Sequence, residues 1–196
     1  MKKIAVIYMG GTFGCIGTPL RPMPASEFLN QLAQYAPQKH VKYFAAPDIK
    51  DSSELCASEW LALAQYINTL SHEFQHFIII HGTDTLSYAA AFLHHLFQQH
   101  HTIILTGSQY PLLTTDGTSL LSDSDAWDNF AFALDQIHKL SHGVYLSFAH
   151  HIHSAYQSYK THTEHINGFS SNPIPTHDHI AQKVIEKDLT EKDHER

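Results

Sequence analysis

Cysteine and long hydrophobic runs are both scarce in this 196-residue chain, and their scarcity excludes several classes of protein. The two cysteines, Cys15 and Cys56, have no metal-ligand spacing, which favours free thiols in a reducing compartment over a disulfide scaffold. No apolar run reaches the ~18 residues of a membrane-spanning helix. The apolar stretch that follows Lys2 and Lys3 is too short for a signal peptide and lacks a cleavage pattern. We therefore expect a cytoplasmic protein with no membrane partner.

Fixed positive charge is also in short supply. Lys and Arg total 12 against 19 Asp and Glu, so the formal net charge is -7, which argues against nucleic acid as a partner. Histidine is abundant instead, and the 18 imidazoles should make the net charge change steeply between about pH 5 and 7. Several of them cluster, at 94–95, 100–101 and 150–153, but no cysteine or carboxylate accompanies them at a metal-ligand spacing. We expect surface or structural roles for these histidines and no metal site.

The hydrophobic fraction of 43% is typical of a globular protein, and the length suits one large domain. Strand-like and helix-like segments alternate along the first two-thirds of the chain. Strands are expected at residues 3–9, 41–46, 76–81, 102–106 and 143–149, and helices at 28–35, 58–70, 86–99 and 123–140. This order predicts an α/β fold, a three-layer αβα sandwich with a mostly parallel sheet. The domain should span residues 1–180, and residues 181–196 should form a charged C-terminal tail with little to bury.

Some prominent residues have plain structural interpretations. Ser58 is expected to cap the second helix, and the helix aromatics should pack in the core. His81 is expected to anchor the turn that follows its strand. Cys15 lies close to Thr12 in the sequence, but nothing nearby supplies the histidine that a thiol nucleophile needs. The aromatics expected in the core are Trp60, Tyr66, Phe92 and Trp127.

Hydroxyl-bearing and charged residues follow the ends of the predicted strands, where ligands bind in open α/β sheets. The strand ends carry Gly10-Gly11-Thr12, His81-Gly82-Thr83-Asp84 and Thr106-Gly107-Ser108, joined by a loop with Asp51-Ser52-Ser53 and by the later Lys160. A threonine hydroxyl becomes a nucleophile only with a neighbouring base, such as a lysine whose pKa is lowered. Backbone N–H groups in the glycine turns are suited to stabilising an oxyanion. Each motif alone is weak evidence for a functional site, because it could equally be a turn, a helix cap or a surface charge. None of the motifs matches a nucleotide-binding loop.

In this order the motifs resemble those of the bacterial L-asparaginase/glutaminase family, specifically its N-terminal catalytic domain. The two signatures are Met-Gly-Gly-Thr-Phe-Gly at 9–14 and His-Gly-Thr-Asp-Thr-Leu at 81–86. Supporting matches lie at 51–53, 106–109, 159–160 and 169–172. The match runs in register from about residue 3 to 176.

The resemblance implies an amidohydrolase that converts L-asparagine, with glutamine as the alternative substrate, to the acid and ammonia. Thr12 would attack the side-chain amide to form a β-aspartyl acyl-enzyme, which water then hydrolyses. Thr83, Asp84 and Lys160 would be the second catalytic triad, with Lys160 governing the protons around Thr83. No metal or organic cofactor is implied.

The resemblance also implies how a substrate is held. Asp84 would bind its α-ammonium group, and Ser52 and Ser53 its α-carboxylate. Ser108 would meet the amide end. The backbone N–H groups of Thr12 and Thr83, in the turns formed with Gly11 and Gly82, would form the oxyanion hole.

The sequence departs from the family at two points. The family has a tyrosine in the loop after the nucleophile, whereas Pro22 lies nearest to that position here. The family also has a smaller C-terminal domain that completes a neighbouring subunit's site, and we expect this chain to lack it. A catalytically impaired or inactive amino-acid-binding fragment is therefore the alternative function, and homo-oligomer formation stays open. A relative that acts on a transfer-RNA-linked substrate is disfavoured by the acidic balance.

Overall fold

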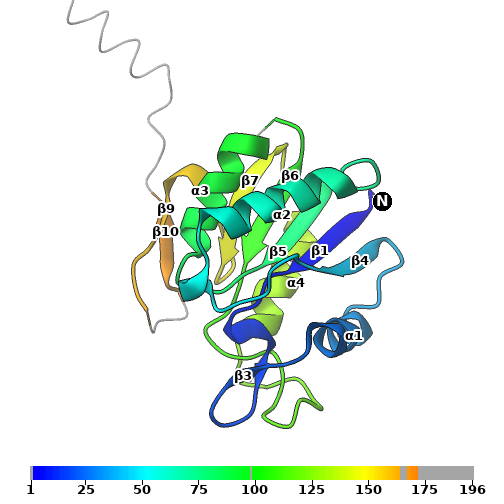
Figure 1. Cartoon of the computed structure of the whole chain (residues 1–196), viewed down its shortest axis with the longest axis vertical. Helices are drawn as coiled ribbons and strands as arrows, with labels where there is room; N and C mark the ends of the chain where they lie inside the picture. The colour runs from blue at the N-terminus through cyan, green and yellow to red at the C-terminus, as the bar shows by residue number, and fades with distance from the viewer. Residues whose placement is uncertain (1, 98, 164–166, 172–196) are drawn as a thin grey trace, which may run out of the picture.

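A six-stranded sheet forms the centre of the molecule in the computed structural model, which describes residues 2–97, 99–163 and 167–171 (Figure 1). The strand order is β4-β1-β5-β6-β7-β8. The strands of this sheet are β1 (Ile4–Tyr8), β4 (Val41–Ala45), β5 (His76–Ile80), β6 (Thr102–Thr106), β7 (Gly143–Phe148) and β8 (His151–Ser154). The first five of these strands run parallel, and β8 runs antiparallel to β7. All residues of β1, β5 and β6 are buried, as expected for strands covered on both faces.

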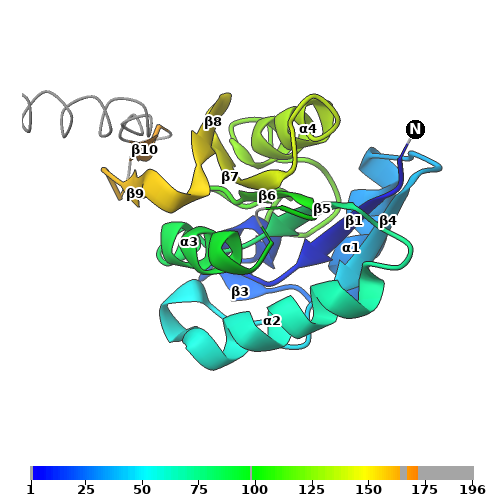
Figure 2. The same cartoon turned by 90° about the horizontal axis from the view of Figure 1, so that it is seen from above.

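Within the described ranges, four α-helices cover the two faces of the sheet. They are α1 (Ala25–Tyr35), α2 (Ala57–Leu70), α3 (Leu86–Phe97) and α4 (Ala126–Gln136). Apolar residues of α2 and α3 share one hydrophobic cluster with one face of the sheet, and those of α1 and α4 share another with the opposite face. Figure 2 shows α2 and α3 on one side of the strands and α4 on the other. The predicted α/β three-layer sandwich with a mostly parallel sheet is therefore confirmed.

Shorter elements join these layers and carry candidate site residues. Three are short 3-10 helices: η1 (Thr12–Gly14), η2 (Ser52–Glu54) and η3 (Ala155–Gln157). Two are small antiparallel hairpins, one of β2 (Cys15–Ile16) with β3 (Arg21–Pro22), the other of β9 (Ser158–Lys160) with β10 (Phe169–Ser171). The η1 and η2 helices follow β1 and β4, so they lie at the carboxyl edge of the sheet.

Helix boundaries differ from the sequence prediction where side-chain contacts decide them. Ser58 does not cap α2; Cys56 is its N-cap, and the Glu59 carboxylate accepts the Cys56 N–H at 3.1 Å. The fourth helix runs over Ala126–Gln136 rather than residues 123–140; Asp125 is its N-cap, and the Asp125 carboxylate accepts the Gln109 N–H of a neighbouring loop. The third ends at Phe97, two residues earlier than predicted.

Strand β8 was not predicted, because its histidine- and serine-rich sequence lacks an apolar alternation. It pairs at the edge of the sheet, and the rings of His151 and His153 stack on one face with centroids 6.1 Å apart. The four helix aromatics pack against the two clusters as predicted. The predicted tail, residues 181–196, lies outside the described residues. Among the helices that are described, none is long and apolar enough to cross a membrane.

Candidate functional site

Two glycine turns bring the ends of β1 and β5 into direct contact. Gly11 has φ +84°, and a Cβ atom there would lie 2.4 Å from the Gly82 Cα. A Cβ atom on Gly82 would lie 2.5 Å from the Ser52 Oγ. Only glycine permits this approach of three segments that are far apart in the sequence. The turns therefore place Thr12 and Thr83, which directly follow the two glycines, on the same edge of the sheet.

Lys160 joins the predicted second triad. Its Nζ donates hydrogen bonds to the Thr83 Oγ1 at 3.0 Å and to the Asp84 Oδ1 at 2.9 Å. The Lys160 side chain is 15% exposed, whereas that of Asp84 is 59% exposed. Pairing of Lys160 with Phe169 across the β9–β10 hairpin fixes the lysine backbone. Three residues that the sequence separates by up to 77 positions thus meet at one ammonium group.

The two serines of the η2 loop have different surroundings. Ser52 is buried, and its Oγ accepts the Asp84 N–H at 3.3 Å, while no side chain or backbone group of the described residues accepts the Ser52 hydroxyl hydrogen. Ser53 is exposed, and its N–H and Oγ both donate to the Asp51 Oδ1, at 2.9 and 2.8 Å. The structure therefore places Ser52 against Asp84, while Ser53 is engaged by a carboxylate of its own loop.

His81 anchors the turn after β5, as the sequence predicted. The indole Nε1 of Trp60 can only donate, and it donates to the His81 Nε2 at 3.3 Å, so the imidazole hydrogen lies on Nδ1. That Nδ1–H donates to the Gly82 carbonyl at 2.8 Å. The bond fixes the peptide plane between Gly82 and Thr83, and with it the direction of the Thr83 N–H. Complete burial lowers the pKa of His81 to about 4.

We expect this buried histidine to make the fold sensitive to acid. Its pKa rises from about 4 in the folded chain to its ordinary value of 6.5 on unfolding, so the unfolded chain binds the extra proton in between. The free energy of unfolding should fall as the pH is lowered from 6.5, by about 3 kcal/mol from His81 once the pH is below 4. Urea unfolding between pH 7 and 4 measures this slope. His81→Asn should reduce this slope, with buried His76 contributing to what remains, and an equal slope in that variant would contradict the assignment.

A buried carboxylate shapes the loop that carries Ser108. Asp125 accepts the N–H groups of Gln109 and Tyr110 at 3.0 Å each, and Asn129 donates to its Oδ2 at 3.1 Å. The Ser108 hydroxyl is buried and donates to the Tyr110 carbonyl, so only its oxygen lone pairs remain for a ligand. The sequence analysis missed Asp125 and Asn129. Their four-residue spacing on a helix is visible in the sequence, but their loop partner is not.

Thr12 lies half-buried at the start of η1, and no described residue hydrogen-bonds its hydroxyl. Pro22, the position nearest to the family's tyrosine, lies exposed in β3. The Cys15 Sγ donates to the Gly11 carbonyl at 3.4 Å. Burial, and then the nearby Asp51, raise the pKa of the Cys15 thiol, which opposes thiolate formation. The hydroxyl of Thr12 is therefore the free nucleophile candidate of this turn.

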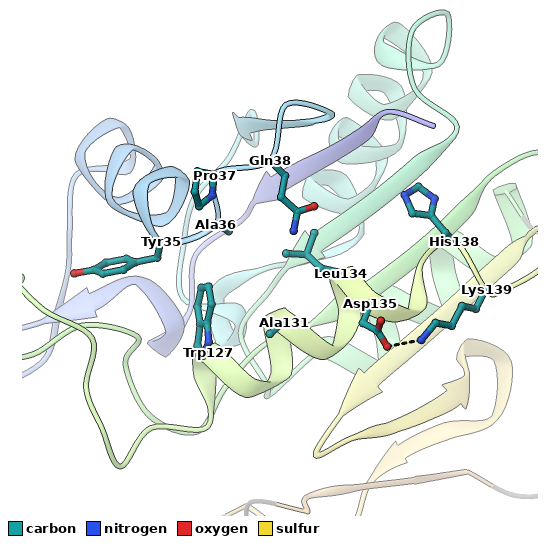
Figure 3. Close-up of a pocket in the computed structure, with 10 residues that line it drawn as sticks. All are labelled: Tyr35, Ala36, Pro37, Gln38, Trp127, Ala131, Leu134, Asp135, His138 and Lys139. Carbon is teal, nitrogen blue, oxygen red and sulfur yellow. Dashed lines mark hydrogen bonds and ion pairs between the residues drawn. The ribbon is translucent and has the colours of Figure 1, made fainter. Parts of the chain in front are cut away.

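Other features lie away from this edge. A hollow of about 530 Å³ separates α1 from α4, with Tyr35 and Trp127 on its walls and the Asp135–Lys139 ion pair at its rim (Figure 3). It contains no predicted site residue. Within the described ranges, no group of three or more His, Cys, Asp or Glu side chains is arranged to hold a metal ion.

Comparison with known proteins matches this chain to one family model and to several curated relatives. The family model described as "Asparaginase, N-terminal" matches residues 3–191. L-asparaginase 1 of Escherichia coli K12 is 28% identical over 186 residues, which cover 89% of this chain and 52% of the relative. The human 60 kDa lysophospholipase is 41% identical over 145 residues, which cover 59% of this chain and 25% of the relative.

Solved structures agree with the sequence comparison. The thermostable L-asparaginase from Thermococcus kodakarensis superposes with a TM-score of 0.73 at 27% identity, covering 88% of this chain and 52% of that one. L-asparaginase I from Vibrio cholerae gives a TM-score of 0.74 at 26% identity, covering 89% and 52%. The chain thus spans about half the length of these asparaginases.

Proposed function

Because this chain belongs to the asparaginase family and matches its N-terminal domain, we propose that it hydrolyses the side-chain amide of L-asparagine to L-aspartate and ammonia. The observation that carries the proposal is the Lys160 ammonium group bound to both Thr83 and Asp84, beside the contact between the Gly11 and Gly82 turns. This arrangement combines a hydroxyl nucleophile, a proton carrier and backbone donors, which are the parts that acyl transfer needs.

Two displacements make up the proposed reaction. The Thr12 Oγ1 attacks the side-chain carbonyl carbon, the C–N bond breaks, and ammonia leaves with the proton that the hydroxyl gives up. Water then attacks the resulting ester, which releases L-aspartate and restores the Thr12 hydroxyl. The N–H groups of Thr12 and Thr83 stabilise the oxyanion in both steps. His81 supports this by fixing the peptide that carries the Thr83 N–H.

Lys160 and Thr83 are assigned to proton transfer. The lysine holds the Thr83 hydroxyl at 3.0 Å, so a proton can pass between the two groups without movement of either backbone. Asp84 neutralises the ammonium charge and, being 59% exposed, keeps carboxylate surface for the α-ammonium of the substrate. With no tyrosine in the loop after Thr12, the Thr83–Lys160 pair is the proton route that this chain offers.

Substrate binding follows from the remaining hydroxyls. Ser52 lies beside Asp84 with a hydroxyl hydrogen that no described residue accepts, so it is suited to the α-carboxylate. Ser53 can bind the same α-carboxylate only if its hydroxyl breaks its hydrogen bond to Asp51. The Ser108 oxygen can accept a hydrogen bond from the amide group of the substrate, since its own hydrogen is engaged. Glutamine, one methylene longer, is the alternative substrate of the same site.

A second function, binding an amino acid without turning it over, is favoured by one observation. The Asp84 carboxylate is mostly exposed, so the described part of the chain leaves the site open on that side. An open site admits water and holds a substrate less firmly, and both effects reduce catalysis more than binding.

Ammonia release distinguishes the two functions. Purified chain, at high concentration and across pH 5 to 9, should release ammonia from L-asparagine, and light scattering on the same sample gives the mass of the active particle. L-Glutamine run in parallel gives the substrate preference. Absence of ammonia together with saturable L-aspartate binding would establish the binding function instead. Absence of both would contradict the proposed site.

A further inference from the structure

The amino edge of the sheet, opposite to the candidate site, carries a second polar cluster that the proposed function does not use. A hollow of about 610 Å³ opens there, between the starts of β1, β5 and β6 and the segment that joins α4 to β7. Lys2, His76, His138 and His142 line it, and Thr102 and Ser141 add oxygen atoms. No carboxylate is among the described residues that line this hollow, in a chain whose acidic residues outnumber its lysines and arginines.

Imidazole nitrogens in this cluster lack the hydrogen bonds that buried polar atoms normally make. His76 is 3% exposed, and its Nδ1 has no partner among the described residues; the same holds for the buried Nε2 of His138. The two rings lie 4.9 Å apart. His40, which is not among the residues that line the hollow, packs against His138 with ring centroids 5.9 Å apart, and its buried Nε2 also has no partner within the described part of the chain. Buried polar groups left without partners point to a water or an ion that occupies the space.

The charges around the hollow indicate which occupant, a water, a cation or an anion, it favours. Burial lowers the pKa of His76 to about 4, and the neighbours that lower it further are His138, Lys2, His142 and His101, all cationic when charged. Carboxylates of adjoining elements are already paired: Asp135 with Lys139, and Glu73 with Lys3 and Lys42. At pH 7 the buried imidazole of His76 is therefore neutral, and Lys2 is the fixed cation among the described residues that line the hollow. Each neutral imidazole still carries one N–H donor, and no carboxylate lining the hollow supplies a counter-charge. A cation would be repelled by Lys2, whereas an anion would be attracted.

We propose that this hollow binds an oxyanion of the phosphate class, held by the Lys2 ammonium and by N–H groups of His76, His138 and His142. A phosphate group carries close to two negative charges near neutral pH and presents several acceptor oxygens, which matches one fixed cation and up to three imidazole donors. The site is separate from the amidase edge, so binding there does not depend on the proposed reaction. Free phosphate and a phosphate monoester share this chemistry.

Calorimetric titration of the intact chain tests the site, with inorganic phosphate and glycerol 3-phosphate as probes at pH 7 and constant ionic strength. Saturable binding of one equivalent is expected, with shifts of the His76 and His138 imidazole signals in NMR spectra. Tighter binding of the monoester would identify an ester as the ligand class, and tighter binding of inorganic phosphate would identify the free ion.

Two double variants test whether phosphate binds in the hollow. Lys2 and His142 are exposed, so the Lys2→Ala/His142→Gln double variant should fold normally and raise the Kd at least about tenfold, because it removes charge-assisted hydrogen bonds. Arg21→Ala/His151→Gln likewise removes one fixed positive charge and one imidazole, at exposed positions outside the hollow, and should leave the Kd unchanged. Equal weakening in both double variants, or an equal effect of chloride at the same ionic strength, would overturn the proposal.

Discussion

Replacing Thr12 with alanine should abolish ammonia release from L-asparagine, with a loss on the order of 10⁴-fold or more in kcat. Such a loss is typical when the nucleophile of a covalent mechanism is removed, because the residual oxyanion donors cannot form the acyl-enzyme. Stability should hardly change, since no described residue hydrogen-bonds the Thr12 hydroxyl. We expect the cost to be below about 1 kcal/mol.

Two controls keep this result interpretable. Thr12→Ser retains a hydroxyl and should keep measurable activity, and rapid quenching with L-asparagine followed by mass spectrometry should find the acyl adduct at residue 12. Thr12→Ala should still bind L-aspartate, because the proposed contacts to Ser52 and Asp84 are intact. An adduct on Thr83 instead, or full activity in Thr12→Ala, would reverse the assignment of the two threonines.

Replacing Lys160 with methionine should remove turnover while the fold persists. The side chain of methionine is nearly as long and fills the same space, but it offers no ammonium to Thr83 and Asp84. Proton transfer by a positioned group typically raises a reaction rate by about 10²–10⁴-fold, so kcat should fall at least about 10²-fold. The ion pair contributes little to stability because Asp84 is 59% exposed, and thermal unfolding should shift by only a few degrees.

A matched substitution separates charge loss from proton transfer. Lys139→Met removes an exposed lysine that is paired with Asp135 on the far side of the fold, and it should leave kcat and KM unchanged. The pH dependence of kcat in Lys160→Arg gives a further readout, since an arginine keeps the charge but does not release a proton at these pH values. Activity in Lys160→Arg close to that of the wild type would show that the charge alone matters.

The sequence predicts the sheet well because its buried strands have mostly apolar sequences. The run at β1 is continuously apolar, that at β5 is apolar after His76, and a glycine follows each strand within two residues, so both their type and their ends can be read without a structure. Parallel strands then place Thr12 and Thr83 at one edge. The contact of Lys160 with Thr83 depends on the β9–β10 hairpin, and here the family resemblance, rather than periodicity, supplied the expectation.

Contacts between side chains and distant loops could not be predicted in the same way. Asp125 has the sequence of an ordinary helix cap, yet it binds the backbone of a loop fifteen and sixteen residues away. Trp60 has the pattern of a core residue, and its indole N–H nevertheless selects the tautomer of His81. Strand β8 is defined by pairing with β7 at the edge rather than by an apolar pattern of its own. Each of these depends on where another segment lies.

The contact between Gly11 and Gly82 has a consequence for how this site can change over generations. Steric conflicts between neighbours are commonly relieved when one residue grows and the other shrinks. Neither position here has an atom to give up, because a Cβ on Gly11 would lie 2.4 Å from the Cα of a residue that is already glycine. No compensating substitution therefore exists within the pair. Both positions should stay glycine during evolution, whatever the catalytic role of the threonines that follow them.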